Sequence, residues 1–284
     1  MNKIKILILA IIFLSFGCKD KNKSTENISQ FYYDIICSPE PMPKYDGNKV
    51  TLLDDNQKPI KDTVISEIEK RRDIFKPCRH MIYRAIWRSK SGEVITNSRI
   101  KMMATGLRWD VQPEKQDEIL IQVEFSERDK EQTKRHQLNK GILERRWMEQ
   151  GIEGVIENVE EIWMHPFRFN QFNFTEVAPF PEIKFPLKIG KTWSGQLRIM
   201  DGWGDWTNTS GSFEYEVVAQ ETINIKYGSI DNCWHIKSKS EYPFGNSTFE
   251  YWFNETLGFV KKEYKNYGNQ TLSIELEEIK ENSM

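Results

Sequence analysis

Short runs of alternating apolar and polar residues recur along the chain and limit the folds it can adopt. Met81–Arg88 reads MIYRAIWR, and Thr271–Ile279 reads TLSIELEEI. Because residues i and i+2 of a strand share a face, each run predicts a strand with one buried face. Further runs are Val94–Thr105, Gly106–Val111, Ile119–Phe125, Val155–Met164, Thr192–Met200, Ser212–Val218, Cys233–Ser240, Thr248–Phe253 and Gly258–Tyr264. This succession predicts a mainly β fold, a curled antiparallel sheet or incomplete barrel around one core.

Two stretches depart from the alternation and predict accessory helices. Thr63–Arg72 reads TVISEIEKRR and gathers its apolar residues on one helical face. Residues 128–150 form the longer candidate, in which Leu138, Ile142 and Trp147 mark an apolar stripe while the first half is nearly all polar. We expect both helices to pack on the sheet.

The N-terminus has the parts of an export signal. Lys3 and Lys5 precede an apolar run that reaches Phe16, and Gly17 and Cys18 follow it. The run spans about 11 residues, which suits a signal peptide and is short for a membrane-spanning helix. We therefore expect residues 1–17 to be a signal peptide.

A small residue before a cysteine at this position resembles the lipobox of bacterial lipoproteins, although Ser15 and Phe16 depart from its usual residues. The resemblance implies that Cys18 is the first mature residue and carries acyl chains that anchor it in membrane lipid. The expected location is then the cell envelope. We expect the outer membrane, in either its periplasmic or its surface leaflet. An ordinary signal peptide with a spare cysteine and an uncleaved anchor are the alternatives.

After the leader, the composition predicts a tether and one domain. Residues 18–30 contain almost nothing to bury and predict a flexible tether. Residues 31–284 predict a single β-rich domain, with an N-terminal part at 31–150 and a C-terminal curled sheet at 151–284.

Three cysteines remain after Cys18, and export places them in an oxidising compartment where disulfides persist. Cys37 and Cys78 both lie beside prolines, and we predict a disulfide between them that leaves Cys233 as a buried thiol. The pairs Cys78–His80 and Cys233–His235 have a spacing that two strands could offer to zinc. Because a disulfide would consume Cys78, we expect no metal site.

Several segments of the second half resemble a known group of proteins. They are Glu161–Arg168 (EIWMHPFR), Pro179–Trp193, Tyr251-Trp252 and Leu257–Glu263 (LGFVKKE). They are similar to uncharacterised lipoproteins of Bacteroidota with a curled-sheet domain of unknown function. The resemblance covers roughly residues 155–279. It implies a curled antiparallel sheet or incomplete barrel, and it brings no activity and no catalytic residue.

The loop DGWGDW holds the first candidate ligand residues. Trp203 and Trp206 could form a platform for sugar rings, and Asp201 and Asp205 could accept hydrogen bonds from sugar hydroxyls. In the alternative reading, the tryptophans fold back and cover the end of the sheet.

His165 and Phe180 are the remaining candidates. His165 has aromatic neighbours and Arg168 nearby, which suits either a general base or a structural imidazole. No nucleophile motif such as Gly-x-Ser-x-Gly accompanies it, so we predict no catalytic residue. Phe180 belongs to the proline-rich segment 166–186, which would either plug the curled sheet or form an apolar lip over a cavity.

These observations predict a function without naming a ligand. The formal net charge of −2 offers no basic surface for nucleic acid, and no cofactor motif is present in the sequence. We predict an anchored envelope lipoprotein that binds an apolar ligand or a protein partner and lacks evident catalytic activity. The alternatives are a carbohydrate-binding module that uses Trp203 and Trp206, and an enzyme for envelope polymers whose site is not visible in sequence.

The leader generates the first prediction. Cys18→Ala removes the acylated thiol, so the variant should move from the membrane fraction to the soluble fraction on cell fractionation, because the anchor depends on the acyl chains. Cys233→Ala is the matched control and should stay with the membrane. A Cys18→Ala protein that still sediments with membranes would contradict the lipid anchor.

Overall fold

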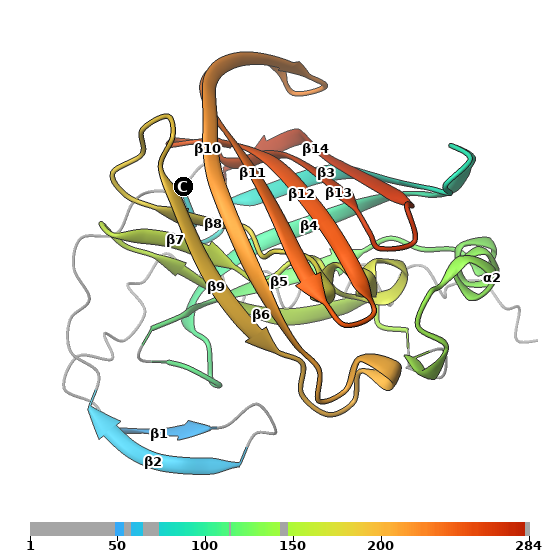
Figure 1. The fold of residues 1–284 in the computed structure, drawn as a ribbon. Coiled ribbons are helices and arrows are strands. Elements are labelled where there is room, and N and C mark those ends of the chain that lie inside the picture. Colours follow the sequence, from blue (N-terminus) through green and yellow to red (C-terminus); the bar gives the residue numbers. More distant parts are fainter. Residues whose placement is uncertain (1–48, 54–57, 65–73, 114, 143–146, 282–284) are drawn as a thin grey trace, which may run out of the picture. The chain divides into compact units, whose positions relative to one another are not determined.

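Strands dominate the part of the chain that this computed structural model describes, residues 49–53, 58–64, 74–113, 115–142 and 147–281 (Figure 1). The strands are β1 (Lys49–Leu53), β2 (Pro59–Val64), β3 (His80–Arg88), β4 (Val94–Arg108), β5 (Asp117–Val123), β6 (Gln150–Glu157), β7 (Glu161–Met164), β8 (Glu182–Lys184), β9 (Thr192–Arg198), β10 (Ser210–Ile225), β11 (Gly228–Tyr242), β12 (Gly245–Asn254), β13 (Gly258–Lys265) and β14 (Thr271–Lys280). The helices are α2 (Glu127–His136) and the 3-10 turns η1 (Lys140–Ile142), η2 (Asn170–Val177) and η3 (Gly204–Trp206).

Twelve of the strands form one antiparallel sheet made of two meanders. The first meander runs from β3 to β8 and the second from β9 to β14, and they join where β3 pairs with β14. The sheet curls until it is nearly closed, so the fold predicted from the alternating runs is confirmed (Figure 1). β1 and β2 pair separately as a two-stranded sheet.

The alternation in the sequence appears directly as alternation in burial. Along β10, Phe213, Tyr215 and Val217 are buried while Glu214 and Glu216 are exposed. The apolar face of each strand therefore lines the inside of the curled sheet, as the period of two requires.

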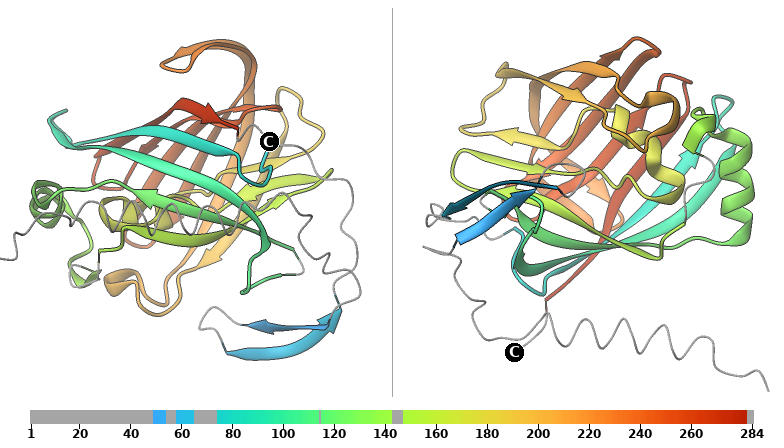
Figure 2. Two further views of the ribbon diagram at one scale, coloured as in Figure 1. Left: turned by 180° about the vertical axis from the view of Figure 1, so that it is seen from behind. Right: turned by 90° about the horizontal axis from the view of Figure 1, so that it is seen from below.

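The proline-rich segment after β7 is largely buried inside the sheet, as the plug alternative expects, and some of its residues, Phe180 among them, also line a pocket. Residues 171–177 of η2 are all buried, and Figure 2 shows this turn enclosed by the sheet. Phe174 packs against Trp87 with ring centroids 5.3 Å apart, and Phe167 packs against Tyr83 at 5.5 Å. The segment 166–181 is called the plug below.

Side chains from the surrounding strands and from the plug itself satisfy polar groups along the plug. Ser240 donates a 3.0 Å hydrogen bond to the carbonyl of Val177, and Tyr215 donates one of 3.2 Å to the carbonyl of Phe180. Gln171 donates to Ser98 at 2.8 Å. A buried carbonyl without a partner costs free energy, so these bonds determine how the plug sits.

The predicted helix at 128–150 is wrong beyond His136. Ser126 and Asp129 form a capping box that starts α2 in the polar half, and the chain becomes extended at Gln137. Leu138 lies against Gly268, and Ile142 reaches the core from η1. The apolar residues therefore pack from irregular backbone, and α2 is held by its caps and charges. Residues 143–146 lie outside the described part.

The predicted helix at Thr63–Arg72 is wrong at its first two residues. Thr63 and Val64 belong to β2, where Thr63 pairs with Val50. β-Branched side chains favour this extended pairing over a helix start. Residues 65–72 lie outside the described part.

Most observed strands differ by a few residues from the predicted limits, and two of the predicted strands are not single separate strands. Val155–Met164 is a hairpin of β6 and β7, because Asn158 accepts hydrogen bonds from the amides of Glu160 and Glu161 at 2.8 Å and turns the chain. Gly106–Val111 is no separate strand: β4 continues through Gly106 to Arg108 with a register irregularity.

The predictions made for the N-terminus concern residues outside the described part, namely the signal peptide, Cys18, the tether and Cys37. Cys78 and Cys233 carry free thiols in the structure, and Cys233 is buried as expected. The pairing of Cys37 with Cys78 stays a prediction, as do the domain limits. Within the described ranges, no helix has the length and apolarity needed to span a membrane.

A buried lysine on β13 lies under the plug. Lys262 is 1 % exposed, and its ammonium lies 4.5 Å from the ring centroid of Tyr83 and 4.4 Å from that of Phe167. Its Nζ finds no hydrogen-bond partner among the described residues. Burial lowers the pKa of Lys262 to about 7, since the aromatic faces only partly replace water around the charge.

This lysine generates the second prediction. An unfolded lysine has a pKa of about 10.4, so between about pH 7 and pH 10 the unfolded state binds a proton that the folded state releases, and the Lys262 contribution to stability rises with pH. Lys262→Met should remove that slope and raise the free energy of unfolding near neutral pH by roughly 2–4 kcal/mol. Urea unfolding at several pH values measures both effects. Lys265→Met, an exposed site on the same strand, is the control. A Lys262→Met curve parallel to that of the wild type would contradict the shifted pKa.

Candidate functional site

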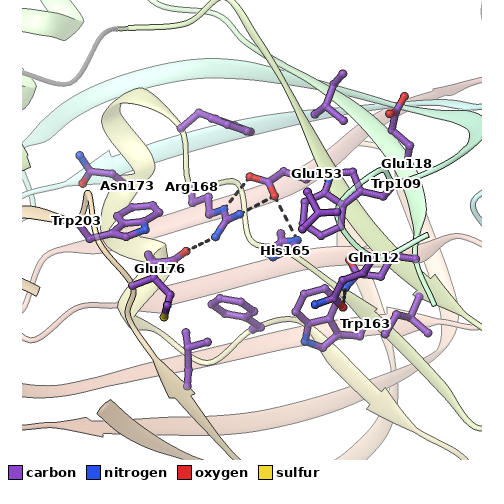
Figure 3. Close-up of a pocket in the computed structure, with 18 of the residues that line it drawn as sticks. Trp109, Gln112, Glu118, Glu153, Trp163, His165, Arg168, Asn173, Glu176 and Trp203 are labelled. Carbon is purple, nitrogen blue, oxygen red and sulfur yellow. Dashed lines mark hydrogen bonds and ion pairs between the residues drawn. The ribbon is translucent and has the colours of Figure 1, made fainter. Parts of the chain in front are cut away.

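A pocket of about 1220 Å³ opens beside the plug, between the β4–β5 loop, β6, β7 and the loop after β9 (Figure 3). Four tryptophans line it, and they come from parts of the chain far apart in sequence: Trp109, Trp147, Trp163 and Trp203. Polar and charged side chains lie between them, so the pocket is aromatic and polar at once.

An ion-paired cluster forms one wall of the pocket. Arg168 donates to both carboxylate oxygens of Glu153, at 2.7 and 2.8 Å, and to Glu176 at 2.9 Å. The three side chains are largely buried. Burial disfavours the guanidinium, but the attraction of the two carboxylates outweighs it and raises the pKa of Arg168 above its ordinary value. The cluster ties the plug to β6, because Arg168 and Glu176 belong to the plug.

His165 lies beside this cluster. Its Nδ1 is 3.2 Å from Glu153, and its ring packs edge-on against Trp109 and Trp163 with centroids 5.1 and 4.6 Å apart. Burial and, next, the positive charge of Arg168 hold the pKa of His165 well below its usual value. The imidazole is therefore neutral at neutral pH.

Further carboxylates line the pocket. Glu161 on β7 and Glu182 on the edge strand β8 both pair with Lys184. Glu118 at the start of β5 is 7 % exposed, and burial raises its pKa, with the charge of Asp110 adding to the effect. These acids come from three different strands.

The structure places the two tryptophans of the DGWGDW loop in different environments. Trp203 is 8 % exposed and lines the pocket, with Arg168 over its ring at 5.7 Å. Trp206 is 2 % exposed and packs against Phe244 and Tyr267 in the core, away from the pocket lining. The two rings therefore do not form an exposed coplanar platform, because Trp206 packs in the core.

Of the other predicted residues, two line the pocket and one does not. Asp201 and Phe180 line the pocket, Asp201 exposed and Phe180 buried. Asp205 instead accepts from the amide of Lys140, and Asn139 donates to the carbonyl of Trp203 at 2.7 Å. Asp205 thus holds its loop against η1.

Glycines permit this loop to approach η1 closely. A Cβ on Gly204 would lie 2.6 Å from the carbonyl carbon of Gly141, and Gly204 has a φ of +55°. Only glycine fits both demands without displacing backbone, and the close approach is what presents Trp203 to the pocket.

Sequence reasoning missed most of the cluster. Trp109, Trp163, Glu153 and Glu176 were not singled out, and only the proximity of His165 to Arg168 pointed toward it. Glu153 lies 15 residues before Arg168 and two residues before the predicted strand Val155–Met164. Strand alternation therefore assigned Glu153 to no face, and its burial on β6 is known only from the structure.

The comparisons with known proteins show similarity at the level of solved structures. No family model matches the chain, and no curated protein matches it. One solved structure, from Bacteroides fragilis, is described as an exported protein with a YmcC-like fold; it is 14% identical and covers 74% of this chain and 99% of its own, with a TM-score of 0.45. Another, from Parabacteroides distasonis, is described as a lipoprotein; it is 11% identical and covers 75% of this chain and 100% of its own, with a TM-score of 0.42.

The ion-paired cluster generates the third prediction. Arg168→Met leaves Glu153 and Glu176 buried without their cation, so the free energy of unfolding should fall by about 3–5 kcal/mol. Replacing both carboxylates as well, in R168M/E153Q/E176Q, should recover most of the loss. Urea unfolding measures both, with the exposed Arg198→Met as control. If the single variant is as stable as the control, the cluster does not hold the plug.

Proposed function

We propose that this protein is a lipid-anchored lipoprotein of the cell envelope and that its pocket binds a glycan. The observation that carries the binding proposal is the alternation of tryptophan faces with fixed polar side chains in one pocket. The anchor rests on Cys18 and the export signal before it, and the outer membrane is the proposed location.

A sugar ring matches this lining because it has apolar C–H faces and a rim of hydroxyl groups. The faces can stack on the half-buried Trp109 and Trp163, as amphipathic aromatic side chains allow. Carboxylates and amides such as Asn173 can accept or donate at the hydroxyl rim. Fixed ion pairs keep these acceptors in position before the ligand arrives, which lowers the entropy cost of binding.

An acyl chain fits the pocket less well. Filling it with hydrocarbon would remove water from Glu118, Gln112 and Asn173 and offer them no hydrogen bond in return. The polar lining therefore favours a glycan over the apolar ligand expected from the sequence.

The cluster also favours binding over catalysis. His165 beside Glu153 has the arrangement of a base and its orienting carboxylate. Both oxygens of Glu153 already accept from Arg168, however, and tryptophans pack against the imidazole. The charges are satisfied within the protein, and this suits a rigid binding wall.

The pocket generates the fourth prediction. Trp163→Ala removes one stacking face, and affinity for the bound glycan should fall by about tenfold or more, as expected for an aromatic residue central to a pocket. The measurement is a glycan-array screen with the full-length protein in detergent, followed by calorimetry on the best binders.

Trp234→Ala is the matched control, because Trp234 is a part-exposed tryptophan on β11 outside the pocket lining. Circular dichroism of both variants checks that they fold alike. Equal affinities of wild type and Trp163→Ala, or the absence of any binder on an array that includes amino-sugar and neutral oligomers, would refute the glycan site.

A further inference from the structure

Acidic side chains outnumber basic ones inside the pocket. Among the described lining residues that are buried or half-buried, the carboxylates are Glu118, Glu153, Glu161, Glu176 and Glu182. Arg168 is the lining base that is similarly buried, and it pairs with two of them. Lys184, which lies beside the pocket, pairs with Glu161 and Glu182. His165 adds no charge when neutral, so the interior keeps an excess of negative charge.

Of these five carboxylates, Glu118 is the one that pairs with neither Arg168 nor Lys184. Its Oε1 is buried and finds no hydrogen-bond partner among the described residues, although Thr105 forms a hydrogen bond with the carboxylate, and its charged neighbour is the acidic Asp110. Gln116, which is 4 % exposed, has a second buried acceptor oxygen without a partner in the described part of the chain. Both residues line the pocket. Two unanswered acceptors at one place favour a ligand that donates hydrogen bonds.

Aromatic faces lie on the same side of the pocket. Gly154, which pairs with Glu118 across neighbouring strands, lies against the Trp109 ring, and Figure 3 shows Trp203 on the opposite side of the pocket. Gln116 also lies close to Trp109, since a Cβ on Gly154 would contact both side chains. The face of a tryptophan ring attracts cations, and the attraction is strongest where water is excluded. Hydrogen-bond acceptors beside tryptophan faces therefore favour a positively charged ligand group that donates hydrogen bonds, such as an ammonium.

We propose that the glycan bound in this pocket carries free amino groups and that one ammonium lies beside Glu118 and Trp109. This inference rests on the proposed function, because it specifies the sugar class that the same pocket takes. The ammonium donates to Glu118 and Gln116, while the sugar ring stacks on a tryptophan. A neutral N-acetylated sugar would leave the carboxylate of Glu118 without a charge partner.

Two oligosaccharides that differ only in this group provide the test. The hexamer of β-1,4-linked glucosamine and the hexamer of N-acetylglucosamine are titrated into the full-length protein in detergent at several pH values, because the preference requires protonated sugar amines and an ionised Glu118, whose pKa is raised by burial. We expect the glucosamine hexamer to bind about tenfold more tightly, and its affinity to fall as salt is added, because part of the attraction is between charges.

Glu118→Gln tests the assignment to a single residue. It keeps the shape of the side chain and removes its charge, so it should abolish most of the preference for the amino sugar, measured as the ratio of the affinities for the two hexamers. Glu214→Gln is the control, because it removes one negative charge from an exposed position on β10 outside the pocket lining.

The outcomes separate this inference from the proposed function. Equal binding of the two hexamers, or tighter binding of the neutral one, would overturn the amino-sugar inference and leave the glycan site standing. A preference that survives Glu118→Gln would overturn the assignment to Glu118. If neither hexamer binds, the amino-sugar inference is overturned. If tetralysine binds where neither hexamer does, the pocket selects positive charge without sugar, and the proposed glycan site is refuted as well.

Discussion

A sheet that curls on itself must fill its own interior, and the plug meets this demand. Residues 171–177 are buried inside the curve of the strands, where Phe172 and Phe174 supply apolar surface. A chain segment in such a place brings backbone carbonyls and amides that need partners. Ser240 and Tyr215, on strands of the second meander, donate hydrogen bonds to two of these carbonyls. Packing and hydrogen bonding thus both fix the position of the plug. The plug in turn positions the elements that line the pocket.

The pocket is a consequence of how the plug enters the sheet. Arg168 lies near the start of the plug and pairs with Glu153 on β6, so one ion pair joins the plug to the wall. A buried ion pair is weak evidence for stability, since desolvation offsets much of the Coulomb attraction. It does hold a geometry, because a bidentate guanidinium accepts few alternatives. A binding site benefits from that rigidity, and this explains why such a charged cluster stands in a pocket wall.

The strands could be predicted from the sequence, and the reason lies in the physics of the curled sheet. One face of each strand is buried and the other is wet, so the pattern of residues repeats the pattern of burial, as along β10. The helix at 128–150 failed because its apolar residues resemble a helical stripe but reach the core from irregular backbone. Its polar half forms α2, which begins at the capping box of Ser126 and Asp129. Local capping therefore decided this element against the longer-range pattern.

The site could be predicted only in fragments. Trp203, Asp201, His165 and Phe180 line the pocket, as their residue types suggested, whereas Trp206 is committed to the core. Nothing in the spacing distinguishes two tryptophans three residues apart, since their fates depend on Tyr267 and on the glycines that bring η1 near.

By itself the sequence determined that the chain is a strand-based protein, and it predicted an export signal at the N-terminus, because alternation and leader composition are local properties. The tertiary structure alone decided that Glu118, Glu153, Arg168 and Trp109 share one pocket. They meet because two meanders pair at β3 and β14 and a plug crosses the interior, and contacts between such distant segments leave no periodic trace in the chain.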